Sequence, residues 1–162
     1  MFDTALYDRA KAFIAACTEA KVRVGVAESC TGGLLAALLT EVPGAADVFD
    51  LGVVSYAYSA KEQILGVPHS VLEQVGAVSE SVARAMAEGI LSHSSVDLAA
   101  GITGVAGPSG GGEEKPIGTV WIAAGRRGKS ITTRKFQFGN PGRSQVRLKS
   151  VTSALEMLEQ LL

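Results

Sequence analysis

Cysteine, histidine and aromatic residues are scarce in this chain of 162 residues. Its two cysteines, Cys17 and Cys30, and its two histidines, His69 and His93, lie far apart without the short spacings of metal ligands. We therefore expect no metal site of the familiar kinds. A disulfide between the cysteines stays open, although free thiols fit a cytoplasmic protein better.

The chain also lacks an excess of charge of one sign and any long apolar run. It has 15 Lys and Arg against 16 Asp and Glu, and this net charge of −1 gives no footprint for nucleic acid. Residues 1–9 lack the basic start and continuous apolar stretch of a signal peptide, and no segment resembles a membrane span. We expect a cytoplasmic protein that binds neither nucleic acid nor a membrane.

What the chain does contain is enough apolar sequence for one folded domain. Hydrophobic residues make up 47% and charged residues 19%, which is too apolar for a disordered chain. A chain of this length can bury a core without disulfides, so residues 1–162 are expected to form a single domain. An exposed hydrophobic patch on such a domain could support a homodimer, and the sequence leaves the oligomeric state open.

Hydrophobic periodicity predicts alternating helices and strands. We expect helices at residues 4–20 and 34–39, after Ser59, after Ser79 and from Asn140 onward. Residues 70–73 have capping-box spacing, and Gly76 can close the turn that they begin. Strands are expected at residues 22–27, 48–58, 97–102, 118–124 and 130–138. Ser59, Ser79 and Asn140 are the expected N-caps. This order predicts an α/β fold, a three-layer α/β/α sandwich whose sheet is mixed but mostly parallel.

The first candidate for chemistry is Ser29, where a strand passes into a helix through Cys30-Thr31-Gly32-Gly33. Free backbone N–H groups of such a turn can stabilise an oxyanion or bind a phosphate, and Gly32 and Gly33 permit close approach. The alternative is that Ser29 or Thr31 merely caps the helix.

A serine nucleophile needs a base, and no histidine stands in a recognisable triad. The available proton acceptors are Lys61, Glu28, Tyr56 and Tyr58. Lys61 follows the second strand within a few residues, so it is expected at the carboxyl edge where Ser29 emerges, where α/β sheets bind ligands. Lysine serves as a base only if its surroundings lower its pKa. The alternatives are that Lys61 is a solvated lysine and that Glu28 holds Lys61 or a helix end.

Three further features point toward the same edge. The glycine-rich segment from Gly101 to Gly112 leaves a strand, and three roles stay open for it: close approach to a ligand, a movable lid or an ordinary flexible loop. Arg143 could bind a phosphate at the start of the last helix or could be solvated. Cys30 is a rival nucleophile that lacks a histidine partner, and it could simply fill an apolar gap.

Several blocks of this sequence together resemble the CinA C-terminal domain family. They extend in order over most of the chain: Val26-Ala27-Glu28-Ser29-Cys30-Thr31-Gly32-Gly33, Val54-Ser55-Tyr56 through Lys61, Leu65-Gly66-Val67, Gly76-Ala77-Val78-Ser79-Glu80-Ser81-Val82, Gly101-Ile102-Thr103-Gly104-Val105-Ala106-Gly107-Pro108 and Glu114-Lys115-Pro116-Ile117-Gly118-Thr119-Val120. One departure is Tyr58-Ser59 after Tyr56, where asparagine is common near the serine.

The resemblance implies deamidation of nicotinamide mononucleotide to nicotinic acid mononucleotide and ammonia, with no metal or cofactor. It implies that Ser29 acts with Lys61, and it places Tyr56, Thr103 and Arg143 around the small nucleotide substrate. Thr31 or Gly104 is expected to supply the backbone N–H for the oxyanion. The family often carries a molybdopterin-binding-like domain ahead of this one, and we expect none here.

Two other functions stay open at this point. One is a non-catalytic nucleotide sensor that uses the same glycine turns to bind a phosphate. The other is a module that associates with a partner in competence or damage responses, as the family's name suggests.

Overall fold

The computed structural model describes residues 2–162. The elements follow in the order α1 (Thr4–Ala20), β1 (Val24–Glu28), α2 (Leu34–Thr40), the 3-10 helix η1 (Ala45–Asp47), β2 (Phe49–Val54), α3 (Tyr58–Leu65), α4 (His69–Val75), α5 (Glu80–His93), β3 (Leu98–Gly104), β4 (Thr119–Arg126), β5 (Thr132–Gln137) and α6 (Arg143–Glu159). In the described part of the chain, no helix has the length and apolarity that a membrane crossing requires.

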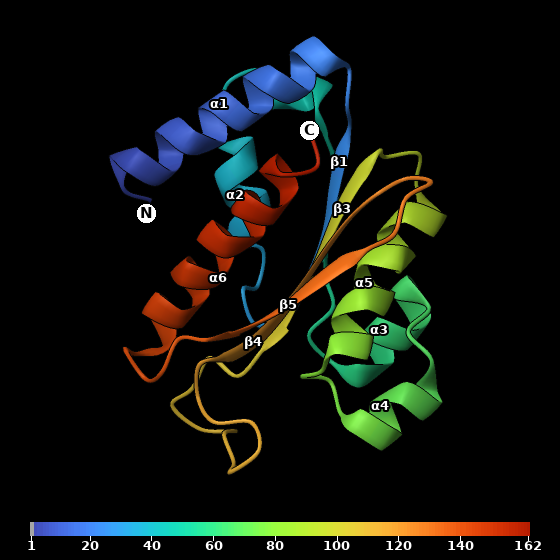
Figure 1. Ribbon diagram of the computed structural model, residues 1–162, viewed down its shortest axis with the longest axis vertical. Coiled ribbons are helices and arrows are strands. Elements are labelled where there is room, and N and C mark those ends of the chain that lie inside the picture. Colours follow the sequence, from blue (N-terminus) through green and yellow to red (C-terminus); the bar gives the residue numbers. More distant parts are fainter. Residues whose placement is uncertain (1) are drawn as a thin grey trace.

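The strands form a five-stranded sheet in the order β2-β1-β3-β4-β5. β1 pairs in parallel with both β2 and β3, whereas the hairpin of β4 and β5 adds two antiparallel pairings. Helices α1, α2 and α6 cover one face, and α3, α4 and α5 cover the other (Figure 1). The predicted three-layer sandwich with a mixed sheet is therefore confirmed.

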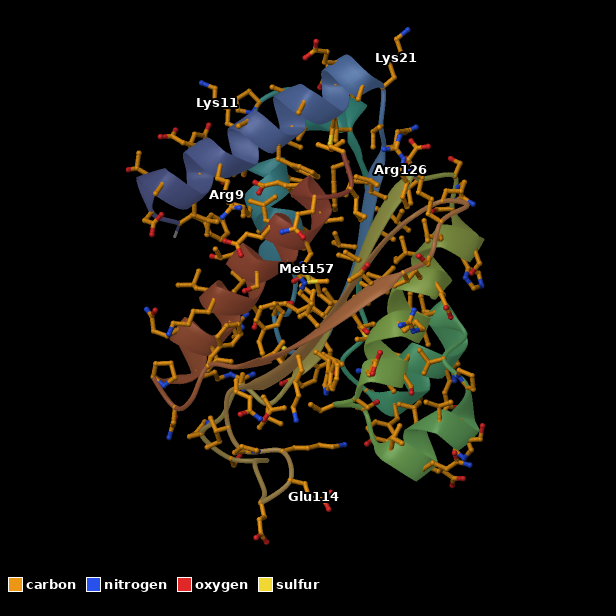
Figure 2. All side chains as sticks on the ribbon, viewed as in Figure 1. Arg9, Lys11, Lys21, Glu114, Arg126 and Met157 are labelled. Atoms are coloured by element: carbon orange, nitrogen blue, oxygen red, sulfur yellow. The ribbon has the colours of Figure 1, made fainter. Side chains whose placement is uncertain are left out.

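Side chains alternate across the sheet and build a hydrophobic core on each face. Val24 and Val26 of β1 face the α1, α2 and α6 layer, whereas Ala27 faces α5. Figure 2 shows Met157 on the inner side of α6, where it is buried in the first of these cores. This alternation is what a strand covered on both sides requires, since successive side chains point to opposite faces.

Helix α5 packs unusually close to the sheet because the strands beneath it carry glycine. A Cβ built on Gly101 would lie 2.4 Å from the Ala83 carbonyl oxygen, and one on Gly25 would lie 2.7 Å from the Ile90 side chain. Both contacts are closer than real Cβ atoms tolerate. Glycine in β1 and β3 therefore sets the spacing between α5 and the two strands that lead into the site.

Three predicted boundaries are wrong. The second strand ends at Val54 rather than at residue 58, and Ala57, not Ser59, is the N-cap of α3. The last helix begins at Arg143 with Gly142 as its N-cap, so Asn140 lies outside it. The predicted cap at Ser79 is confirmed, since its hydroxyl accepts a hydrogen bond from the Val82 N–H.

The parallel strands bring three segments to one edge of the sheet. Glu28 at the end of β1 is in register with Val54 at the end of β2 and with Ile102 near the end of β3. Two hydrogen bonds extend these ladders, from Ser29 N–H to the Ile102 carbonyl and from Ser55 N–H to the Glu28 carbonyl. The residues that follow the three strands therefore meet at the carboxyl edge.

Candidate active site

Ser29 lies in a sharp turn between β1 and α2. Its N–H is held by the Ile102 carbonyl at 3.0 Å, and its own carbonyl accepts a hydrogen bond from Gly32 N–H at 3.0 Å. Only 8% of the residue is exposed. The backbone of Ser29 is thus fixed on both sides, and the hydroxyl has little freedom to leave the carboxyl edge of the sheet.

Lys61 is the partner of this hydroxyl and is completely buried. Its Nζ lies 3.0 Å from Ser29 Oγ, 2.6 Å from the Ser55 carbonyl and 3.4 Å from the Tyr56 carbonyl. Burial lowers the pKa of Lys61 below its usual value of 10.5 because the charged ammonium loses its hydration. The alternative that Lys61 is a solvated lysine is wrong.

In its neutral form Lys61 can use all three partners of Nζ. A neutral lysine has two N–H bonds and one lone pair, and the Ser55 and Tyr56 carbonyls can take both hydrogens. The lone pair then faces Ser29 Oγ, which can donate its proton. The arrangement can therefore deprotonate the serine without histidine.

The turn after Ser29 contains two backbone donors without a partner in another residue. Among residues 2–162, the N–H groups of Cys30 and Thr31 donate no hydrogen bond to another residue. Gly32 and Gly33 follow with φ of 59° and 93°, a backbone that side chains rarely allow. Two unpaired N–H groups in the turn that carries a serine hydroxyl are the kind of donors that an oxyanion site uses.

The Glu28 carboxylate binds backbone N–H groups where this turn enters α2. Its carboxylate, 1% exposed, accepts hydrogen bonds from the N–H groups of Gly33, Leu35 and Ala36 at 3.1, 3.2 and 2.9 Å. These are orphan donors at the start of α2, and a negative charge there is also favoured by the helix dipole. The alternative that Ser29 or Thr31 caps this helix is wrong, and of the two roles considered for Glu28 the structure shows the helix end.

Arg143 joins two loops at the rim of the site. One guanidinium nitrogen donates to the Gly107 carbonyl at 2.8 Å, and another donates to the Tyr56 hydroxyl at 3.0 Å. No carboxylate pairs with Arg143 in the described chain. Its charge, at the first residue of α6, therefore remains uncompensated and can attract an anion. Tyr56, 60% exposed, lies on the same rim.

Thr103 and Gly104 end β3 at the same edge. The Thr103 hydroxyl donates to the Ala77 carbonyl at 2.8 Å, so it ties β3 to the segment before α5. Gly104 packs against β4, where a Cβ would lie 2.6 Å from a Val120 methyl and 2.9 Å from the Thr119 carbonyl oxygen. Both residues lie where the sequence predicted, and their contact with a ligand stays a prediction.

The glycine-rich segment lines an open cavity of about 550 Å³ beside this rim. The walls come from the segment itself and from the residues before α5, and include Tyr58, Ala77, Val105, Gly111 and Lys115. Ser29 and Lys61 do not line this cavity. Figure 2 shows Glu114 on this segment, at the end of the molecule opposite α1.

Cys30 is a poor nucleophile in this setting. It is 4% exposed and belongs to the core beneath α2 and α6, and burial raises the pKa of its thiol to about 12. The thiolate, which is the reactive form, is therefore scarce at neutral pH. Both cysteines are free thiols, and within residues 2–162 no three His, Cys, Asp or Glu side chains group together in a way that could hold a metal ion.

One site residue was missed by the sequence reasoning. Arg147 donates from its Nη2 to the Thr31 carbonyl at 2.9 Å, and so contacts the turn that follows Ser29. A signal was available, because Arg147 lies four residues after Arg143 and thus on the same face of a helix.

Comparison with known proteins shows relatives over almost the whole chain. The CinA C-terminal domain model matches residues 7–162. A CinA-like protein of Akkermansia muciniphila is 50% identical over 128 residues, which cover 79% of this chain and 31% of that protein. Nicotinamide-nucleotide amidohydrolase PncC of Enterobacter agglomerans is 47% identical over 134 residues, which cover 82% of this chain and 80% of that protein. The chain spans about a third of the length of the first curated relatives it matches.

Solved structures agree with this relationship. The competence/damage inducible protein CihA of Agrobacterium tumefaciens superposes with a TM-score of 0.97 at 41% identity, covering 99% of this chain and 98% of that one. A CinA superfamily protein of Escherichia coli gives a TM-score of 0.92 at 34% identity, covering 100% and 94%. This chain therefore belongs to the CinA C-terminal domain family.

Proposed function

We propose that the protein is a nicotinamide-nucleotide amidohydrolase, which hydrolyses the carboxamide of nicotinamide mononucleotide to nicotinic acid mononucleotide and ammonia. The observation that carries the proposal is the buried Lys61 Nζ, 3.0 Å from Ser29 Oγ with two carbonyls on its other side. The relative named nicotinamide-nucleotide amidohydrolase, 47% identical, supports the choice of substrate. The activity would serve pyridine nucleotide salvage.

The first step is attack by the serine. Ser29 Oγ forms a bond to the carboxamide carbon while its proton passes to the lone pair of Lys61 Nζ. The N–H groups of Cys30 and Thr31 hold the oxygen that becomes negative. The pyridinium charge of the substrate withdraws electrons from the amide carbon, which makes it a better electrophile than the amide of nicotinamide.

The second half of the reaction returns the enzyme to its starting state. The tetrahedral intermediate collapses and the C–N bond breaks as Lys61 gives its proton to the leaving nitrogen, or as the Tyr56 hydroxyl gives a proton and then receives the one on Lys61. In either case ammonia leaves and Lys61 is neutral again. Water then attacks the acyl carbon while Lys61 takes one of its protons. The C–Oγ bond breaks as Lys61 returns that proton to Ser29 Oγ, and nicotinic acid mononucleotide leaves. Water is the second substrate, and no step consumes an oxidant or a reductant.

The rim residues would bind the rest of the nucleotide. Arg143 carries an unpaired charge at the start of α6 and would hold the 5′-phosphate by charge-assisted hydrogen bonds. Thr103, Gly104 and the turn from Cys30 to Gly33 would surround the nicotinamide. Glu28 acts only through the turn, since its carboxylate is occupied by three backbone N–H groups.

The test is to incubate the purified protein with nicotinamide mononucleotide and a metal chelator, and to measure ammonia and nicotinic acid mononucleotide. We expect equal amounts of both products from the parent and none from a folded Ser29→Ala variant. Cys30→Ala removes the neighbouring thiol but keeps the backbone N–H of residue 30, so it should still release ammonia, and it separates the serine hydroxyl from the thiol as the attacking group.

Two results would contradict the proposal. Binding of the nucleotide without ammonia release would favour a non-catalytic sensor. Full activity in Ser29→Ala would assign the chemistry to another group. A role in competence or damage responses that survives Ser29→Ala would be independent of this chemistry.

A further inference from the structure

Within residues 2–162 the Arg147 side chain donates one hydrogen bond, and its acceptor belongs to the turn that carries the unpaired N–H groups. Its Nη2 donates to the Thr31 carbonyl at 2.9 Å, and it forms no ion pair within the described residues. The guanidinium lies directly against the turn, since a Cβ built on Gly32 would come within 3.2 Å of Nη2.

This turn depends on contacts that restrain it, because its two glycines allow many backbone conformations. Gly32 and Gly33 both have positive φ, and glycine loses more conformational freedom on folding than any other residue. The Thr31 carbonyl also accepts a hydrogen bond from Leu34 N–H, but at 3.2 Å this bond closes only a short turn within the same loop. The bond from Arg147 comes from α6, 116 residues away in the sequence, and ties the turn to a rigid element.

Two anchors together define the turn. Glu28 holds the N–H groups of Gly33, Leu35 and Ala36, which fixes where the turn enters α2. Arg147 holds the Thr31–Gly32 peptide plane, and the Ser29 backbone is held by Ile102. The unpaired N–H groups of Cys30 and Thr31 lie between these fixed points.

We propose that Arg147 is a positioning residue, which holds the Thr31 carbonyl and thereby orients the Cys30 and Thr31 N–H groups toward the oxyanion. The inference rests on the proposed amidohydrolase function. Oxyanion donors work because they are oriented before the reaction, and a misplacement of about 1 Å at a catalytic centre can cost about 100-fold in rate. Arg147 itself touches no reacting atom.

The test compares Arg147→Met with Lys149→Met, an exposed residue of the same helix that loses the same charge. Methionine keeps an apolar stem against the turn. We expect kcat for nicotinamide mononucleotide to fall about 10- to 100-fold in Arg147→Met at nearly unchanged KM, because donor alignment matters most in the transition state. Lys149→Met should match the parent.

Chemical rescue separates this role from a general loss of structure. In Arg147→Ala, added methylguanidinium should restore part of kcat, because it can donate to the same carbonyl, and it should leave the parent unchanged. A kcat within threefold of the parent in Arg147→Met, or a raised KM at unchanged kcat, would overturn the proposal. The raised KM would place Arg147 on the substrate's phosphate.

Amide NMR keeps the inference testable if the parent releases no ammonia. In that case the proposed function fails, but the resonances of the Cys30 and Thr31 N–H groups still report the turn. Arg147→Met should shift them, because the peptide planes of the turn change orientation, whereas Lys149→Met should not. Unchanged resonances in Arg147→Met would overturn the positioning role whatever the activity.

Discussion

The carboxylate of Glu28 gives the sharpest test of how the site is held together. Its Oε2 accepts from Gly33 and Leu35 N–H, and its Oε1 accepts from Ala36 N–H. In Glu28→Gln the amide oxygen can keep the pair at Oε2, but the amide NH₂ then faces the Ala36 N–H, so two donors oppose each other.

The magnitude follows from the bonds that are lost. A hydrogen bond to a charged group contributes about 1.5–3 kcal/mol, so Glu28→Gln should lower the free energy of unfolding by about that amount. Glu28→Ala removes all three bonds and leaves the buried Leu35 N–H without a partner, so the same rate per bond gives a loss of about 4.5–9 kcal/mol. Since a domain is typically stable by about 5–15 kcal/mol, the alanine variant should lie near the limit of folding.

The assay is urea unfolding, followed by far-UV circular dichroism and by the fluorescence of Trp121, the single tryptophan. Glu73→Gln, an exposed glutamate of α4, is the matched control and should change stability by less than about 0.5 kcal/mol. A Glu28→Gln variant as stable as the control would contradict the prediction that the carboxylate stabilises the start of α2.

Three other predictions follow from particular contacts. Burial lowers the pKa of Lys61 below 10.5, and the base must be neutral, so kcat/KM should rise with pH and level off above the pKa of Lys61. Lys61→Arg should be inactive at every pH. A flat pH profile in the parent would reject Lys61 as the base. Gly89→Ala should destabilise the protein by about 1–3 kcal/mol in urea titrations, because its Cβ would lie 2.3 Å from the Leu65 carbonyl oxygen; a gain of stability would contradict the close packing of α3 and α5. Burial raises the pKa of Cys17 and of Cys30 to about 12, so neither thiol should react with a disulfide reagent at neutral pH until urea unfolds the chain. Rapid labelling of the native protein would contradict the burial of these thiols.

The wrongly predicted ends of β2 and α6 show where tertiary contacts override the local sequence pattern. Residues 55–58 have the β-branched and aromatic neighbours of a strand, but β2 ends at Val54 because β1, its neighbour in the sheet, ends at the paired Glu28. Asn140 and Pro141 have the pattern of a helix start, yet Gly142 has φ of 97°, which is incompatible with a helical residue. Strand pairing and a positive φ decide these ends, and neither is visible in the pattern.

The alternation of helices and strands, the three-layer fold and the location of Ser29 and Lys61 at one edge could all be predicted from the amino-acid sequence. Periodicity and the direction of parallel strands are local rules, so they can be read along the chain. Three contacts could be found only in the folded structure. Lys61 is fully buried and its Nζ is hydrogen-bonded to Ser29 Oγ, Glu28 caps α2, and Arg147 donates to the Thr31 carbonyl. These contacts join residues up to 116 positions apart, and their energies depend on burial and on distances of a few ångströms, which only the packed layers fix.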